Sequence, residues 1–225
     1  NILDGIEFAK QAHERTLLGE ARPLGESLRA YLSEIEAVER ADLAGSNRRW
    51  RETIGDVDVL AASDNGDAVV DAFLEWEDGT DTIEAGSTKA SVRTGSGIRV
   101  DLRVVDPGEF GAALQYFTGS RDHNIRLRNR AIDYDLKMNE YGLFDISDVE
   151  DPDSDQRVGD RVAGETEAGM YEELDLPLIP PELREDAGEV AAAANGALPD
   201  LLEEGEIRGD LHTHSELSDG DATIE

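Results

Sequence analysis

The stretch AGSNRRWRETIGDVDVL, residues 44–60, combines a glycine-serine turn, two neighbouring arginines and two closely spaced aspartates. Its second half alternates with a period of two, which is typical of a strand. Val57 and Val59 face one side, and Asp56 and Asp58 face the other side, about 7 Å apart. Two such carboxylates repel one another unless they share divalent cations, and Mg²⁺ prefers carboxylate and phosphate oxygens. In an acidic chain, an isolated Asp-x-Asp is by default a pair of ordinary exposed acids.

The first half of the same stretch predicts a phosphate cradle. Gly45 and Ser46 follow an apolar strand end and precede a short helix, so backbone N–H groups can approach a phosphate closely. Arg48 and Arg49 could clamp further phosphate oxygens with paired N–H donors. A Gly-Ser pair alone is a common turn, but here it stands close to the two aspartates. The combination therefore indicates a phosphate cradle beside a metal site.

A third carboxylate, Asp101, lies in the stretch RVDLRVV, residues 99–105. Val100, Leu102 and Val104 form the apolar face of this predicted strand, and Asp101 lies on the polar face. If this strand pairs beside residues 56–60, three carboxylates converge on one face of the sheet. That is the arrangement that a two-metal phosphoryl transfer requires.

The rest of the chain predicts an α+β fold with a mostly antiparallel sheet flanked by helices. Helical patterns cover residues 1–20, 23–38, 67–76 and 110–136, and strand patterns cover residues 40–44, 56–61, 82–85, 89–93 and 98–105. Residues 145–160 are predicted to form an acidic loop, residues 177–181 a turn, and residues 188–205 a short alanine-rich helix or linker.

The charge of the chain is strongly negative, with 52 acidic and 21 basic residues and a net charge of −31. Residues 1–144 hold 27 acids and 17 bases (net −10), and residues 145–225 hold 25 acids and 4 bases (net −21). Uniform acidity would argue against a nucleic-acid partner, but most of the excess lies outside the predicted site. Acid excess with three lysines against eighteen arginines suggests adaptation to molar salt, although an ordinary acidic cytosolic protein is the alternative.

Several classes of protein are excluded or disfavoured by composition. The absence of cysteine excludes disulfides, thiolate zinc sites and a cysteine nucleophile. No apolar run approaches the length of a membrane span, and we expect a cytoplasmic protein without a membrane partner.

In their order and spacing, the motifs resemble those of the family X DNA polymerases, most closely the bacterial and archaeal branch with a C-terminal PHP (polymerase and histidinol phosphatase) domain. The resemblance rests on Gly45-Ser46-x-Arg48-Arg49, Gly55-Asp56-x-Asp58-x-Leu60, Arg99-x-Asp101-x-Arg103, Tyr116-Phe117-Thr118-Gly119-Ser120, Asn124, Arg128 and Asn139-Glu140-Tyr141. It implies a nucleotidyltransferase palm with a small α/β thumb. The implied division is the end of the fingers at 1–22, the palm at 23–109, the thumb at 110–187, a linker at 188–206 and the truncated start of a PHP domain at 207–225.

The resemblance also implies roles for individual residues. Asp56, Asp58 and Asp101 would be the catalytic carboxylates and would bind two Mg²⁺ or Mn²⁺ ions. Nucleotide contacts are implied for Gly45, Ser46, Arg49, Gly55, Tyr116, Phe117, Gly119 and Asn124, of which Ser46, Arg49 and Gly55 would hold the β- and γ-phosphates. DNA contacts are implied for Arg103, Arg128, Asn139, Glu140 and Tyr141. Asn47 departs from the apolar residue that the family often carries there, so the packing of that turn is left open.

From the residues alone, two of these features have simpler explanations. Tyr116 and Phe117 could be a core aromatic pair. The arginines of residues 121–130 could be a solvated helix face, although a net charge of +3 in this segment favours a surface that faces phosphates.

Near the C-terminus, His212-x-His214 has a common metal-ligand spacing, with both imidazoles on one face of a predicted strand. The resemblance to a PHP domain implies metal ions on His212, His214 and Asp219 in a complete domain. Because further ligands of such a site are absent, we predict that residues 207–225 form no phosphoesterase site.

The sequence therefore predicts a DNA-directed DNA polymerase that extends a primer with dNTPs, acts on primer-template or gapped DNA in repair, and is monomeric. One alternative is a nucleotidyltransferase that acts on a small molecule or RNA, which would have no reason to keep residues 116–120 and the arginine-rich helix. Another is a non-catalytic acidic interaction module, which would be indifferent to the replacement of Asp101.

Overall fold

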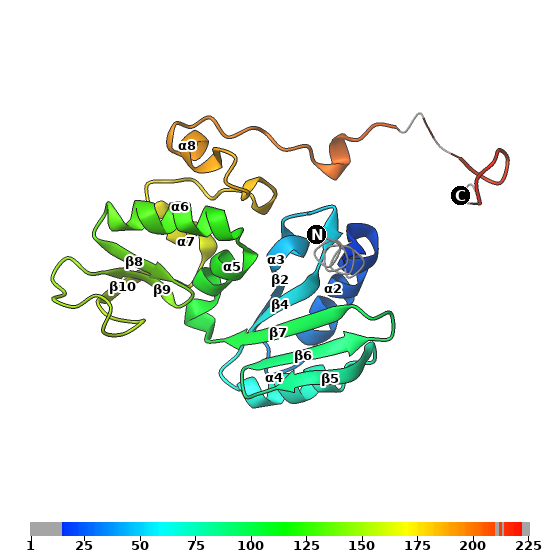
Figure 1. Ribbon diagram of the computed structural model, residues 1–225, viewed down its shortest axis with the longest axis horizontal. Coiled ribbons are helices and arrows are strands. Elements are labelled where there is room, and N and C mark those ends of the chain that lie inside the picture. Colours follow the sequence, from blue (N-terminus) through cyan, green and yellow to red (C-terminus); the bar gives the residue numbers. More distant parts are fainter. Residues whose placement is uncertain (1–14, 210–211, 213, 222–225) are drawn as a thin grey trace, which may run out of the picture.

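The computed structural model describes residues 15–209, 212 and 214–221 (Figure 1). Its larger sheet has five strands in the order β2-β4-β7-β6-β5. These strands are Arg40–Leu43, Asp56–Ala62, Arg99–Val105, Lys89–Thr94 and Gly79–Ala85. Strands β4 and β7 are parallel, and the other three neighbouring pairs are antiparallel, which confirms the predicted mostly antiparallel sheet.

One face of this sheet is covered by helices α2 (Leu18–Ser33) and α4 (Gly66–Leu74). The two helices and the strands bury one aliphatic cluster, to which Val57 and Val59 of β4 and Val100 and Leu102 of β7 belong. Burial of these side chains supplies about 1.5–3 kcal/mol each toward the stability of the fold. The valines and leucines that alternate in the sequence thus point to this face.

Helix α2 begins at Leu18, not at Pro23 as predicted, and ends at Ser33, before Val38. Its buried positions Ala21, Gly25, Leu28 and Leu32 share one helical face. Ala21 and Gly25 give little hydrophobic signal, which is why the sequence pattern puts the start too late. Gly25 is needed there, because a Cβ would lie 2.8 Å from Leu43 Cδ2. Of the predicted helical segment at 1–20, residues 1–14 lie outside the described chain, and Thr16–Leu17 form the short strand β1.

The opposite face of the sheet meets helix α5 (Phe110–Thr118). Leu60 and Ala62 of β4 pack there against Phe110, Ala113 and Leu114. Asp56 and Asp58, at the start of β4, face the same side of the sheet as Leu60 and Ala62, because alternate residues of a strand share a face. The sheet therefore directs both carboxylates to the side on which α5 lies.

A second, smaller sheet has the order β10-β9-β8, with strands Asp160–Ala163, Gly142–Asp145 and Leu136–Asn139. Its core includes side chains from α5, α6 (Arg121–Ile132) and α7 (Glu167–Glu172). The helical pattern predicted over 110–136 is confirmed for most of its length but forms two helices, because Gly119 has φ +70 directly after α5 and Ser120 caps the start of α6; Leu136 already begins β8. Figure 1 shows α5 lying between the two sheets, and it contributes Ala112 to one cluster and Ala113 to another.

The remaining elements are short. They are α3 (Gly45–Arg48), β3 (Thr53–Ile54), α8 (Glu189–Ala194) and the 3₁₀ helices η1 (Pro107–Glu109), η2 (Pro181–Leu183) and η3 (Glu204–Glu206). Helix α8 packs through the buried Ala193 into the core of the smaller sheet, so the start of the predicted linker is part of that packed unit. Within the described residues, no helix has the length and apolar character needed to cross a bilayer.

Candidate active site

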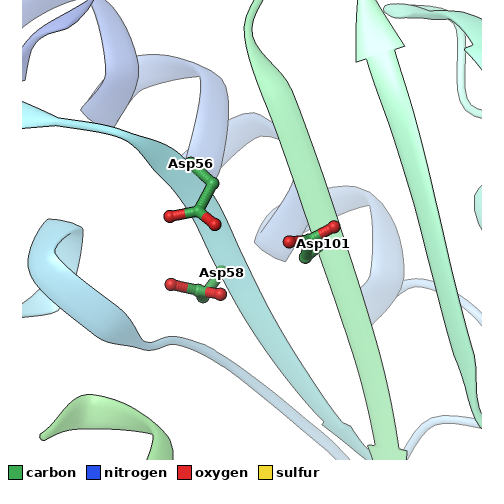
Figure 2. A group of neighbouring side chains, drawn as sticks. All are labelled: Asp56, Asp58 and Asp101. Carbon is green, nitrogen blue, oxygen red and sulfur yellow. The ribbon is translucent and has the colours of Figure 1, made fainter. Parts of the chain in front are cut away.

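Three aspartates come together on the face of the larger sheet that α5 partly covers. In the register of the parallel pair β4–β7, Asp58 lies beside Asp101, and Asp56 lies two residues before Asp58. Candidate ligand oxygens of Asp56, Asp58 and Asp101 all lie within 4.8 Å of one another. Figure 2 shows the three carboxylates projecting from the two neighbouring strands toward a common space. The expected pairing of the two strands is thus present, and the group could hold a divalent cation.

The electrostatics of this group are unfavourable without a cation. Burial raises the pKa of Asp58, and the neighbouring carboxylates of Asp56 and Asp101 raise it further, to about 7. A carboxyl group with this pKa is partly protonated at neutral pH. A cation bound by the three groups would remove the repulsion and favour the ionised form.

Burial of the Asp58 carboxylate and its repulsion by Asp56 and Asp101 predict that Asp58→Asn stabilises the metal-free chain. The pKa of Asp58 is raised from 3.8 to about 7, so between these values the folded chain holds a proton that the unfolded chain has lost. The contribution of Asp58 to stability therefore falls as pH rises from about 4 to about 7 and stays low above that range. Because solvent reaches part of the side chain, we expect a gain of about 1–3 kcal/mol at pH 8, smaller than the full shift would give.

Urea unfolding in EDTA and molar KCl at pH 5 and pH 8 measures this effect. The stability difference between Asp58→Asn and the unmodified chain should be smaller at pH 5. Excess Mg²⁺ at pH 8 should stabilise the unmodified chain more than the variant. Equal stabilities of the two chains at pH 8 in EDTA would contradict the predicted repulsion.

Asp101 is held by Arg99, from the same motif, and by Ser91, which no sequence motif indicates. The hydroxyl of Ser91 donates a short hydrogen bond to Asp101 Oδ1, and Arg99 Nε donates to the same oxygen at 2.9 Å. Arg99 Nη2 also donates to Ser91 Oγ at 3.2 Å, and Ser91 is fully buried. Ser91 pairs directly with Asp101 across β6 and β7, a neighbour that only the sheet register reveals. These bonds fix one oxygen of Asp101 and orient the other.

Gly45 packs directly against the carboxylate of Asp58. Its backbone has φ +56, and a Cβ built on it would lie 2.0 Å from Asp58 Oδ2. The preceding residue, Ala44, donates its N–H to the carbonyl of Asp58 at 2.8 Å. Ser46 follows in α3, and Asn47 is buried with its side-chain amide donating to the carbonyl of Ala21 at 3.2 Å. The glycine of the predicted cradle is therefore required by the approach of α3 to β4.

The two arginines of the predicted phosphate clamp, Arg48 and Arg49, have different hydrogen-bond partners. Arg48 makes a bidentate ion pair with Glu167 of α7, at 2.9 and 2.7 Å, so its predicted role as a phosphate clamp is wrong for this structure. Arg49 Nε donates to Glu185 Oε1 at 2.8 Å, and its Nη1 donates to the carbonyl of Thr118 at 2.5 Å. Arg49 keeps further N–H donors beyond these two bonds.

Glu167 of α7 joins Arg48 of α3 to Arg184, which follows η2. Arg184 is fully buried and donates Nη1 to Glu167 Oε1 at 2.7 Å. Burial raises the pKa of Glu167, but the hydrogen bonds and charges of Arg48 and Arg184 outweigh it and hold the pKa below its usual value. Breaking such a buried network by removing one partner is costly, so this network fixes α3 against α7.

Tyr116 and Phe117 lie at the end of α5 and are only partly buried, and Phe117 but not Tyr116 packs against the cluster around Leu60 and Phe110, so the alternative of a core pair holds for Phe117 in part. Their rings meet edge to face at 5.1 Å, and the Arg103 guanidinium lies 4.6 Å from the centre of the Phe117 ring. Phe117 and Arg103 line a small cavity of about 100 Å³ together with Asp58 and Asp101. An aromatic side chain and a cation thus stand beside the carboxylates.

A second cavity, of about 280 Å³, opens where α5 passes into α6. It is lined by Arg49, Tyr116, Phe117, Thr118, Gly119, Ser120, Arg121, Asn124 and Arg128. The side-chain amide of Asn124 donates to the carbonyl of Tyr116 at 2.7 Å, which holds this turn together. Most of the residues predicted to face the nucleotide therefore share one cavity. Gly55 lies apart from it, at the exposed turn between β3 and β4.

The arginine-rich face of α6 is only partly available to phosphates. Arg126 pairs with Asp186 at 2.8 Å, and Arg130 donates to the carbonyl of Leu174 at 2.6 Å. Arg121 and Arg128 are exposed and line the cavity. The prediction of a phosphate-facing surface therefore applies to two of the four arginines.

The predicted DNA contacts at residues 139–141 lie at the turn between β8 and β9. The amide of Asn139 donates to the carbonyl of Gln156 at 2.5 Å, and Asn139 Oδ1 accepts the backbone N–H of Tyr141 at 2.9 Å. The Arg157 guanidinium lies 3.8 Å from the centre of the Tyr141 ring. Glu140 is partly exposed. Together with Tyr116 and Arg128, these residues line a groove of about 810 Å³.

The C-terminal histidines lie apart from this site. The rings of His212 and His214 are 5.1 Å apart, and His214 Nδ1 makes a short contact with Asp219 Oδ1. Neither histidine belongs to a strand of the described chain, so the predicted strand is wrong at these two positions. The acidic group that could hold a metal within the described residues is the aspartate triad of β4 and β7.

Comparisons with known proteins agree with this arrangement. Residues 113–185 match the family model of the DNA polymerase beta thumb. The chain is 35% identical over 225 residues to the DNA polymerase/3′-5′ exonuclease PolX of Bacillus subtilis (strain 168), and the match covers 99% of this chain and 37% of that protein. The chain therefore spans well under half the length of this relative.

A solved structure has the same fold. The crystal structure of Leishmania infantum polymerase beta, a ternary P/T complex, superposes with a TM-score of 0.63 and 21% sequence identity. The superposition covers 78% of this chain and 80% of that chain. At this identity the similarity shows the fold alone.

Proposed function

We propose that this chain, which belongs to the family X DNA polymerases, adds a deoxynucleotide to the 3′-hydroxyl of a primer, opposite a template base, and releases pyrophosphate. The observation that carries the proposal is the convergence of Asp56, Asp58 and Asp101 within 4.8 Å beside a cavity that Arg49 lines. Gap filling in DNA repair would be the cellular task.

The carboxylates would hold two divalent cations, Mg²⁺ or Mn²⁺. The donor set consists of hard oxygen ligands. Burial, and then the charges of Asp56 and Asp101, raise the pKa of Asp58, and a bound cation would offset both. When bound, such ions neutralise the charge that develops on the transferred phosphate. Asp101, with one oxygen fixed by Ser91 and Arg99, would orient the primer 3′-hydroxyl and help to remove its proton.

The nucleotide would lie in the cavity between α3 and the start of α6. Arg49, which lines the cavity, would hold the β- and γ-phosphates, and Gly45 would allow the close approach of the chain. The same role is proposed for Ser46 and Gly55 from the resemblance alone, since neither lines this cavity. Tyr116 and Phe117 would flank the sugar and disfavour a 2′-hydroxyl. Gly119 and Asn124 would complete the contact surface for the nascent base pair. The partly exposed aromatic rings support this placement.

The DNA would lie across the groove along the smaller sheet. Arg128 is exposed and lines both the nucleotide cavity and this groove, which suits a contact with the template. Arg103, Glu140 and Tyr141 would contribute further contacts. Asn139 is bonded to Gln156 and Tyr141, so it would shape the turn that presents these residues.

The domain division expected from the resemblance is part of the same proposal. Residues 23–109 would be the palm, residues 110–187 the thumb, residues 1–22 the end of the fingers, residues 188–206 a linker whose first part, α8, packs with the thumb, and residues 207–225 the start of a PHP domain. His212, His214 and Asp219 would bind metal in a complete PHP domain. We expect the protein to act as a monomer in the cytoplasm.

Single-nucleotide filling of a gapped duplex in molar KCl tests the proposed function. With Mg²⁺ or Mn²⁺ present, the chain should extend the primer by the dNTP that is complementary to the template base. The control is the same duplex with each of the three mismatched dNTPs, which should be incorporated at least about tenfold more slowly. Transfer to RNA or to a small molecule, with no extension of the DNA primer, would favour the alternative nucleotidyltransferase.

A further inference from the structure

We infer that Glu185 is a positioning residue for nucleotide binding: it holds the guanidinium of Arg49 in the orientation in which Arg49 receives the triphosphate. The inference rests on the proposed function of the same site. Glu185 lies 136 residues from Arg49 in the sequence and belongs to none of the motifs.

Two hydrogen bonds fix the plane of the Arg49 guanidinium. Glu185 Oε1 accepts from Nε at 2.8 Å, and the carbonyl of Thr118 accepts from Nη1 at 2.5 Å. The Arg49 side chain is 13% exposed and the Glu185 side chain is 28% exposed, so solvent screens this pair only in part. With two of its nitrogens bonded, the guanidinium has little freedom to rotate.

These two bonds leave Nη2 and one N–H of Nη1 to donate to a ligand. A guanidinium carries five N–H donors, and these two bonds use two of them. Arg49 lines the cavity of about 280 Å³, whereas Glu185 is not among the described residues that line it. The carboxylate therefore orients Arg49 from outside the cavity and leaves the space for the phosphates open.

Glu185 is itself held in place by its neighbour in the chain. Arg184 is fully buried, donates Nε to the carbonyl of Ile179 at 2.8 Å and pairs with Glu167. The carbonyl of Arg184 also accepts the N–H of Ser120, at the start of α6, at 3.0 Å. The segment that carries Glu185 is thus anchored to the turn that forms the cavity. A preorganised acceptor of this kind reduces the cost of ordering a long side chain when the ligand binds.

Glu185 could instead compete with the triphosphate for Arg49, since both are anions. The two roles predict opposite changes in nucleotide affinity. Loss of a competitor strengthens binding, whereas loss of a positioning residue weakens it. The position of the carboxylate outside the cavity favours positioning.

The test compares Glu185→Ala, Glu185→Gln and the control Glu182→Gln, an exposed glutamate three residues earlier. We expect Glu185→Ala to raise KM for the dNTP about tenfold in gap filling, with kcat within about threefold of the unmodified chain. Glu185→Gln keeps a hydrogen-bond acceptor and should recover most of the loss. Glu182→Gln, with the same change of charge, should leave KM unchanged. Thermal melting confirms that each variant is folded.

Calorimetric titration with a dNTP and Mg²⁺ makes the same comparison without catalysis. If the unmodified chain binds the dNTP but does not extend a primer, the proposed polymerase activity is wrong while the positioning of Arg49 is still measured. A dissociation constant about tenfold higher for Glu185→Ala supports the inference. An unchanged or lower constant for Glu185→Ala, or an equal effect of Glu182→Gln, overturns it, and so does an unmodified chain that binds no dNTP.

Discussion

Replacement of Asp101 by asparagine is expected to lower the rate of nucleotide incorporation by about 10³-fold or more. Asp101 is the contribution of β7 to the carboxylate triad, and its ligand oxygens lie within 4.8 Å of those of Asp56 and Asp58. Loss of one anionic ligand for a catalytic cation removes several kcal/mol of charge stabilisation in the transition state, and each 1.36 kcal/mol corresponds to a factor of ten in rate. Arg49 and the other two aspartates remain, so we expect dNTP affinity to stay within about threefold.

Rapid-quench measurement of single-nucleotide incorporation at saturating dNTP and metal gives the rate, and calorimetric titration gives the affinity. The matched control is Asp81→Asn, which removes one exposed carboxylate from edge strand β5 of the same sheet. This control should retain the full rate. Equal rates for Asp101→Asn and the unmodified chain would contradict a catalytic role for the triad and favour a non-catalytic interaction module.

The face of the sheet that carries the three aspartates could be predicted, because alternating apolar and acidic residues are a local signal in the sequence. Alternation of apolar and acidic residues in two segments placed Asp56, Asp58 and Asp101 on the polar faces of their strands, and the structure has both strands within one or two residues of the predicted bounds. The sequence left open whether the two strands are neighbours. The parallel pairing of β4 and β7, which places Asp58 beside Asp101, depends on how β5 and β6 fill the remaining positions of the sheet.

The residues that the sequence did not reveal act across long separations. Glu167 and Glu185 lie 119 and 136 residues from the arginines with which they pair, and an ion pair between distant segments leaves no periodic pattern. In a chain with 52 acidic residues, two more glutamates carry no local signal. The same pairs explain why two adjacent arginines have different contacts: Arg48 joins α3 to α7 through Glu167, and Arg49 lines a cavity.

The charge of the chain is likewise informative only when it is resolved by position. A net charge of −31 argues against DNA binding if it is spread evenly over the surface. The structure pairs Arg126 and Arg130 with groups of the protein and leaves Arg121 and Arg128 exposed at the cavity between α5 and α6. The proposed contact with phosphates would thus depend on few side chains, so single substitutions there should have large effects.

Substitution of Gly45 by alanine is expected to abolish most activity and to destabilise the fold. Gly45 has φ +56, a backbone conformation that costs alanine about 1 kcal/mol. A Cβ at this position would also lie 2.0 Å from Asp58 Oδ2, far inside contact distance, so either α3 or the carboxylate has to move. Because a misplacement of about 1 Å in a catalytic group costs about 10²-fold in rate, we expect a loss of this order or more.

Gly97→Ala provides the matched control, because Gly97 has φ +87 but nothing lies within 4 Å of the position that a Cβ would take. The control should show the backbone cost of about 1 kcal/mol in urea unfolding and an unchanged rate of incorporation. Gly45→Ala should show a larger loss of stability together with the loss of rate. The second substitution Asp58→Gly removes the clashing carboxylate, so the double variant should recover stability relative to Gly45→Ala while remaining inactive. If Gly45→Ala instead matched Gly97→Ala in both measurements, contact between α3 and the Asp58 carboxylate would not be what requires glycine at this position.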